Sequence, residues 1–294
     1  MRKSFLFLGI SALAIAASAI VIQLQLFKPL QETITFFPID ETVQYQSANT
    51  TLTLQKDKKN NQHQVDWKES SVLDREAYLR QDLGLLFVNG LLRGMVGKWE
   101  QDTAELSQGG IISTGESARY DAITFHYSEL HGTGDRISSA QRMSDDMLYV
   151  IDSRFSPLRS FRVAKSNQER EWKQVLDRSM ENRLNKSLQK AAKEYGVNLA
   201  NYVAIPLYEI RKYEDQPIQG FSQRETANIL GRLWEGLYKN YYLGIKKSDG
   251  TEVDPLDSTM PLILISKDKS HLLAVTQTKD GESIILKQLL QGNT

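Results

Sequence analysis

The chain has 294 residues, of which 40% are hydrophobic and 24% are charged, the composition of an ordinary folded protein. Lys plus Arg equals Asp plus Glu at 36 each, so no excess of positive charge points to nucleic acid as a partner. Cysteine is absent, which excludes disulfides, thiolate nucleophiles and Cys-ligated metal centres. The length is compatible with one large domain or two smaller ones.

The N-terminal segment predicts a membrane anchor. Arg2 and Lys3 precede an uncharged, mostly apolar run over residues 4–25, and the next charge is Lys28. A run of this length can cross a hydrocarbon core of about 30 Å as a helix. Positive charge before the run keeps the N-terminus in the cytoplasm, so the bulk of the chain is expected to be extracytoplasmic. We therefore predict a signal anchor or transmembrane helix over residues 1–27 and a single-pass protein of the cell membrane.

Cleavage by signal peptidase is the alternative. The Ala-Ser-Ala tripeptide at 17–19 has the small-residue pattern of a cleavage site, and cleavage near Ala19 would give a secreted protein. The apolar run continues to Ile22, whereas the sequence after a cleavage site is normally more polar. The uncleaved anchor is therefore the preferred prediction.

Residues 28–70 are predicted to form a strand-rich segment and an exposed loop that lead into the main domain. Apolar residues alternate with polar ones at 43–45 and again at 52–54, which is typical of strands. The stretch 56–64 contains no apolar residue and predicts the loop. His63 lies in this stretch, so we expect its side chain to be solvated.

The main extracytoplasmic domain is predicted over residues 71–294. Its first part, 71–99, carries apolar residues at near-helical spacing with glycines between them, which predicts a buried helix. Residues 109–163 alternate in apolar character and predict strands. Ser166 and Ser222 each begin a capping box before a long apolar stripe, which predicts two further helices. Three apolar runs close the chain, and an Asp-Gly pair between the last two predicts a hairpin turn.

The order of these elements predicts the fold class. Strands and helices follow one another without a regular βαβ alternation and without an internal repeat. We therefore expect an α+β fold, in which a mostly antiparallel sheet is packed with about three amphipathic helices and is preceded by one N-terminal transmembrane helix.

The stretch FHYSELHGTGD, residues 125–135, gathers the residue types of a metal or hydrolytic site. His126 and His131 are five positions apart, whereas zinc binding by one helix needs histidines four positions apart. In a strand, odd and even positions point to opposite faces, so Glu129 and His131 share one face and His126 lies on the other. We therefore predict no metal site, and the candidates for catalysis are His126, Glu129, His131 and Asp135.

A second group of candidates lies on the predicted aromatic helix, residues 223–243. Trp234 and Tyr238 could line a ligand pocket, although aromatic residues at helical spacing more often pack in a core.

The function expected from these features is that of a non-catalytic domain that binds or regulates a partner in the cell envelope. It would be attached to the membrane through residues 4–25, would use no cofactor and would not bind nucleic acid. The first alternative is a cell-envelope hydrolase with a histidine and carboxylate site around residues 126–135. The second is a small-ligand carrier with a pocket by the aromatic helix. An enzyme is the less expected class, because no catalytic motif lies in the structural context that it requires.

Overall fold

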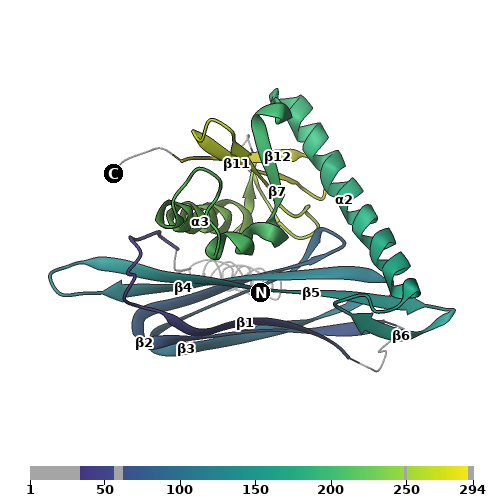
Figure 1. The fold of residues 1–294 in the computed structure, drawn as a ribbon, viewed down its shortest axis with the longest axis horizontal. Helices are drawn as coiled ribbons and strands as arrows, with labels where there is room; N and C mark the ends of the chain where they lie inside the picture. The colour runs from purple at the N-terminus through teal and green to yellow at the C-terminus, as the bar shows by residue number, and fades with distance from the viewer. Residues whose placement is uncertain (1–33, 56–61, 248–249, 291–294) are drawn as a thin grey trace, which may run out of the picture. The chain divides into compact units, whose positions relative to one another are not determined.

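The computed structural model describes residues 34–55, 62–247 and 250–290, which belong to one compact unit beginning at Ile34. Of these residues, 51% lie in strands and 24% in helices, so sheet dominates the unit and the predicted α+β class is wrong (Figure 1). No helix within these ranges is long and apolar enough to span a membrane. The predicted anchor over residues 1–27 lies outside the described residues.

The large sheet consists of six antiparallel strands: β1 (Tyr45–Leu54), β2 (His63–Val88), β3 (Leu91–Thr114), β4 (Ala118–His131), β5 (Ile137–Ser153) and β6 (Ser156–Phe161). Strand β2 pairs with β3 along one edge, and along its other edge it pairs first with β1 and then with β4. Its register with β3 shifts between Val72 and Ala77, and such an irregularity bends a strand. The sheet folds over on itself, and β1 lies beneath β4 and β5 in Figure 1.

No backbone ladder connects β1 to β5 among the residues described. Hydrogen bonds from side chains connect the two strands instead. The backbone N–H of Leu52 donates to the carboxylate of Asp146 over 2.7 Å. Arg162 donates to the carbonyl oxygen of Leu52 over 2.7 Å and also binds both oxygens of Asp146. Asp146 and Arg162 thus bond the backbone N–H and C=O groups of Leu52, which a neighbouring strand would otherwise bond.

The region 71–99, predicted as a buried helix, forms the β2–β3 hairpin instead. Asn89 and Gly90 make the turn with φ angles of 51° and 77°, and the two-residue type I′ turn needs positive values at both positions. The residues before the turn, Leu83–Val88, are buried on both faces. A strand covered on both faces has a continuous apolar run and no alternation, which is why its sequence resembles a buried helix.

The second part of the unit contains two long helices and a smaller sheet. The helices are α2 (Asn167–Tyr195) and α3 (Gln223–Leu237), and α3 continues into the π-turn η3 (Tyr238–Tyr242). The shorter helical turns are η1 (Leu199–Asn201) and η2 (Leu207–Glu214). The small antiparallel sheet has the order β12 (Ser283–Leu289), β11 (His271–Gln277), β10 (Leu262–Ser266), β7 (Tyr202–Pro206), and a separate pair joins β8 (Ile245–Lys246) to β9 (Glu252–Val253).

Both predicted capping boxes are present. The hydroxyl of Ser166 accepts from the N–H of Glu169, whose carboxylate accepts from the backbone of the cap, and Ser222 and Glu225 repeat this arrangement on α3. At the end of α2, Gly196 has a φ of 66°, the left-handed conformation that favours glycine after a helix. The predicted helix starts are therefore confirmed at Ser166 and Ser222.

Two hydrophobic cores lie on opposite faces of the strands β2, β4 and β5. On one face, the odd-numbered residues of β4 pack against α2, α3 and the small sheet, as Phe125 does in stacking on Trp234 with ring centroids 5.1 Å apart. On the other face, the even-numbered residues of β4, such as Tyr120, pack inside the folded sheet against residues of other strands, such as Trp67 of β2. These strands are therefore buried on both sides.

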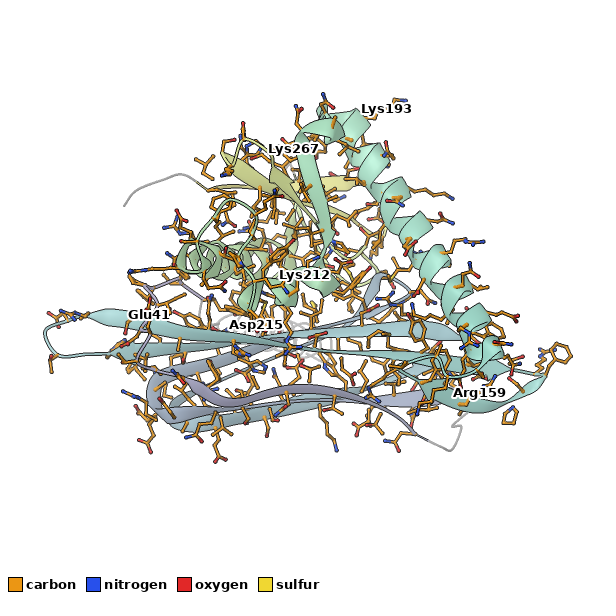
Figure 2. The ribbon with its side chains drawn as sticks, viewed as in Figure 1. Glu41, Arg159, Lys193, Lys212, Asp215 and Lys267 are labelled. Atoms are coloured by element: carbon orange, nitrogen blue, oxygen red, sulfur yellow. The ribbon has the colours of Figure 1, made fainter. Side chains whose placement is uncertain are left out.

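Charged side chains of both signs surround the unit, in keeping with the zero net charge of the sequence. Figure 2 labels several that are exposed: Glu41, Lys193, Lys212, Asp215 and Lys267.

Candidate functional site

The inner face of the folded sheet changes from apolar to polar along its strands. The inward residues of β4 run from Ala118 and Tyr120 at one end to Thr124 and His126 further along. In β2 the inward positions include Leu86 near the hairpin and polar residues nearer the bend. Period-2 alternation therefore brings polar side chains from several strands together in the interior.

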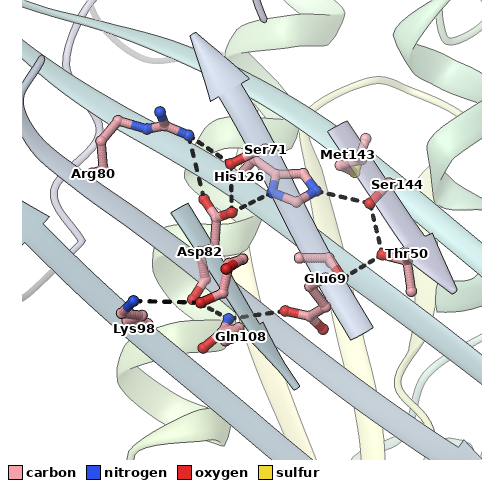
Figure 3. Close-up of polar contacts among 12 residues, drawn as sticks. Thr50, Glu69, Ser71, Arg80, Asp82, Lys98, Gln108, His126, Met143 and Ser144 are labelled. Carbon is pink, nitrogen blue, oxygen red and sulfur yellow. Dashed lines mark hydrogen bonds and ion pairs between the residues drawn. The ribbon is translucent and has the colours of Figure 1, made fainter. Parts of the chain in front are cut away.

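A chain of hydrogen bonds runs through this polar interior (Figure 3). His126 Nδ1 lies 2.6 Å from Asp82 Oδ2, and its Nε2 lies 2.8 Å from Ser144 Oγ. Ser144 Oγ also lies 2.6 Å from the hydroxyl of Thr50, which in turn lies 2.6 Å from that of Thr124. The chain links β2, β4, β5 and β1.

A buried arginine supports the acid at the start of this chain. Arg80 donates to Ser71 Oγ over 2.6 Å, and Ser71 Oγ donates to Asp82 Oδ2 over 2.6 Å. The guanidinium nitrogen Nη2 of Arg80 lies 3.9 Å from the other oxygen of Asp82, and its Cζ lies 5.0 Å from the ring centre of Tyr45. Both charged side chains have no exposed surface. A buried ion pair of this kind needs added hydrogen bonds to offset desolvation, and Ser71 provides them.

Glu69 is the second acid of the interior, with only 2% of its surface exposed. Its pKa is raised to about 8, mainly by burial and to a smaller extent by the nearby Asp82 charge, while hydrogen bonds from Thr124 and Gln108 oppose the rise. Gln108 Nε2 donates to Glu69 Oε2 over 2.8 Å. A Cβ atom at Gly84 would lie 1.7 Å from Glu69 Oε1, so glycine is needed there to leave room for the carboxyl group.

The order Ser144, His126, Asp82 is that of the triad of serine hydrolases, in which histidine takes the proton of the serine hydroxyl. Ser144 is only 4% exposed and His126 is fully buried, so a substrate carbonyl cannot reach the hydroxyl. The hydroxyl of Thr50 on β1 also lies within hydrogen-bonding distance of Ser144 Oγ and covers it from that side. In this conformation the array is an enclosed polar core rather than an open catalytic site, although Asp82 Oδ1 and Arg80 Nε have no hydrogen-bond partner among the described residues.

The four catalytic candidates from the sequence are divided among three places. His126 belongs to the interior, whereas His131 Nε2 lies 2.5 Å from Glu129 Oε1 near the end of β4. The ring of Tyr78 stacks on His131 at a centroid distance of 3.7 Å, and both border a hollow of about 480 Å³. Asp135 is exposed in the following turn, with a φ of 56°.

The expectation that His63 is solvated is wrong. His63 is fully buried in β2, where its Nδ1 lies 2.9 Å from Asp152 Oδ2 and its Nε2 lies 2.8 Å from the hydroxyl of Tyr120. Gln64, also in the predicted loop, belongs to β2, and residues 56–61 of that loop lie outside the described residues. Within the described ranges, no three His, Cys, Asp or Glu side chains are grouped so that they could hold a metal ion.

The two aromatic candidates of α3 and η3 lie in the main core. Trp234 is fully buried and donates from Nε1 to Met143 Sδ over 3.2 Å. Tyr238 is 4% exposed and stacks on Tyr242 with ring centroids 5.4 Å apart. A hollow of about 450 Å³ lies beside the same helix, but other residues line it.

Sequence reasoning did not find the Asp82–His126 pair, although both residues stand in plain alternation with apolar neighbours. The two side chains meet because Asp82 and His126 are opposite each other in the β2–β4 ladder. Residues 71–99 were predicted as a helix, so Asp82 was not placed on a strand, and His126 was assigned only to the strand face opposite Glu129 and His131. No family model, curated protein or solved structure matches this chain, so its site rests on the geometry described above.

Proposed function

We propose that the chain is a membrane-anchored, extracytoplasmic and non-catalytic domain that binds or regulates a protein partner in the cell envelope. The observation that carries this proposal is the open edge of β3. From Gly94 to Thr114 this strand pairs with β2 alone among the described residues. An unpaired edge presents backbone N–H and C=O groups to which a strand of another protein can add.

Two exposed side chains make this edge strand a suitable docking surface. Trp99 is 43% exposed and Ile111 is 61% exposed, and both belong to β3. Large apolar residues at an interface bury area on binding, and tryptophan is among the residues enriched at binding hot spots. Backbone pairing and these side chains would together supply affinity and specificity.

The anchor in the proposal rests on the sequence. The apolar run 4–25 follows two positive charges and has the length of a membrane span. If the anchor is uncleaved, the protein should fractionate with membranes, and protease added outside intact cells should digest all but its N-terminal segment. Recovery of a soluble product beginning near Ile20 would refute anchoring and leave only export.

The non-catalytic part of the proposal rests on the enclosure of the Ser144–His126–Asp82 array. A nucleophile must contact its substrate, and the hydroxyl of Ser144 contacts only protein groups in the interior. The hydrolase alternative would need β1 to move away from β5 before any chemistry.

Site-specific crosslinking tests partner binding in the full chain within its membrane. A photoreactive amino acid is placed at Trp99 or Ile111 on β3, and at Val175 on α2 as a control of similar exposure (59%). We expect one discrete crosslinked product from both β3 positions and none from the control position. Trp99→Asp should reduce the product formed from position 111. Equal crosslinking from all three positions, or none from β3, would contradict the proposal.

A further inference from the structure

A hollow of about 450 Å³ opens between α3 and the strands β11 and β12. Its volume lies within the range of about 300–1,000 Å³ that is common for small-molecule sites. Its apolar lining is aliphatic throughout: Leu233, Leu237, Leu272, Ala274, Ile285 and Leu286. None of the described residues that line it is aromatic, so a flexible alkyl chain fits this surface better than a planar ring system.

The hollow lies beside the contact between α3 and β12, where Gln288 of β12 donates to the carbonyl oxygen of Ile229 on α3 over 3.1 Å. Gly236 on α3 lines the hollow, and a Cβ atom added to it would meet no other atom within 4 Å. On the other side, Ile285 and Leu286 of β12 remain partly exposed although they pack against the main core. β12 is the last strand of the small sheet, so no further strand of this sheet covers these side chains.

The rim of the hollow carries an excess of positive charge. Arg232 from α3 and Lys287 from β12 are both exposed, and within the described part of the chain neither forms an ion pair with an acid. The third cation of the rim, Lys239, is neutralised by Glu235 over 2.6 Å. Two cations from different elements therefore lie beside an aliphatic surface without an acid partner among the described residues, and the Cζ of Arg232 is 5.9 Å from the ring centre of Phe36.

We propose that this hollow binds a free fatty-acid anion, with its alkyl chain on the aliphatic lining and its carboxylate between Arg232 and Lys287. The guanidinium group of arginine matches the two oxygens of a carboxylate, and lysine adds a second charge-assisted hydrogen bond. The site lies on a different face of α3 from Trp234, which packs against β4. The proposal does not depend on partner binding at β3, because the two sites share no residue.

Photoaffinity labelling tests this site in the full chain within its membrane. The probe is an alkynyl fatty acid that carries a diazirine on its alkyl chain, and labelled peptides are mapped after proteolysis. We expect labelling of peptides from α3 and β12 that saturates with probe concentration. Unlabelled fatty acids should compete, with about fourfold tighter binding for each added methylene from octanoate to dodecanoate.

Variants of Gly236 separate occupancy of the hollow from folding. Gly236→Phe places a ring in the empty space and should abolish labelling, whereas Gly236→Ala adds one methyl group and should retain it. Neither variant is expected to lower the unfolding midpoint, since both replace a helical glycine at which an added Cβ atom meets no other atom within 4 Å. Labelling that persists unchanged in Gly236→Phe would overturn the proposal.

Charge variants test the position of the carboxylate. Arg232→Gln combined with Lys287→Gln should raise the probe concentration for half-maximal labelling by about tenfold. The matched control removes two exposed cations of α2, Arg183→Gln with Lys186→Gln, and should have no effect. An equal effect of both pairs would overturn the assignment of the carboxylate. Labelling by a phospholipid form of the probe, but not by the free acid, would overturn the assignment of the ligand.

Discussion

Glu69→Gln is expected to remove a specific pH dependence of stability. Burial raises the pKa of Glu69 to about 8 from its ordinary value of 4.5, so the folded protein keeps this carboxyl group protonated where the unfolded chain has ionised it. The folded state then binds more protons than the unfolded state. The free energy of unfolding therefore falls as the pH rises through this window, and the contribution of Glu69 is fully favourable only below pH 4.5.

The size of the effect follows from the width of that window. One pKa unit corresponds to about 1.4 kcal/mol, so the interval from 4.5 to about 8 amounts to about 5 kcal/mol above pH 8. Glutamine has the shape of the protonated acid and its oxygen can still accept from Gln108, but it cannot ionise. The variant should match the wild type near pH 4.5 and exceed its stability by several kcal/mol at pH 9.

Urea unfolding from pH 4.5 to pH 9 measures this difference in the compact unit that begins at Ile34. Burial also raises the pKa of Glu214 to about 7, but this group titrates in both proteins and cancels in the comparison. Glu41→Gln, at an exposed position, is the control and should follow the wild type at every pH. If the curves of wild type and Glu69→Gln run parallel across the range, Glu69 is ionised in the folded state and the reasoning fails.

Three further predictions concern the core, the β1–β5 join and the polar interior. Leu233→Ala should lower the free energy of unfolding by about 2–5 kcal/mol, because it truncates a buried side chain. Ser222→Ala, which removes the cap of α3, should lower it by about 1 kcal/mol. An unchanged unfolding midpoint for Leu233→Ala would show that the apolar face of α3 is not part of the core. Arg162→Ala should speed amide hydrogen exchange at Leu52, and unchanged exchange would show that the join does not depend on this arginine. A fluorophosphonate probe should leave Ser144 unlabelled in the folded protein, and labelling there would favour the hydrolase alternative.

The features that the sequence predicted correctly are those in which a few neighbouring residues decide the structure. Each capping box contains its own hydrogen-bond partners three positions apart, so Ser166 and Ser222 identified their helices without tertiary information. The hairpin at Asn89-Gly90 was also a local signal, but the glycine-interrupted apolar run before it was interpreted as a helix. Two strands joined by an Asn-Gly turn at this position would have been the correct prediction.

The features that the sequence did not predict depend on contacts between distant strands. Alternation tells which residues share a face, but it does not tell whether water or a second layer covers that face. His63 was placed next to solvent and His126 was assigned to a strand face with no known covering, whereas the folded sheet covers both. The partner of His126 lies 44 positions earlier in the chain, at Asp82, and only the β2–β4 register brings them together.

Strand β2 takes part in three ladders, so a single slip in its alignment would change the whole sheet. Moving β2 by one residue against β4 would turn Asp82 away from His126 and place an odd-numbered apolar residue, such as Leu83, among the hydroxyl groups. Each polar group left unpaired in the interior costs about 1–3 kcal/mol, and a charged group costs more. The loss of free energy in a misaligned sheet is thus comparable to the whole free energy of unfolding of a domain, which is about 5–15 kcal/mol. The buried acid and histidine thereby act during folding as selectors of one strand alignment.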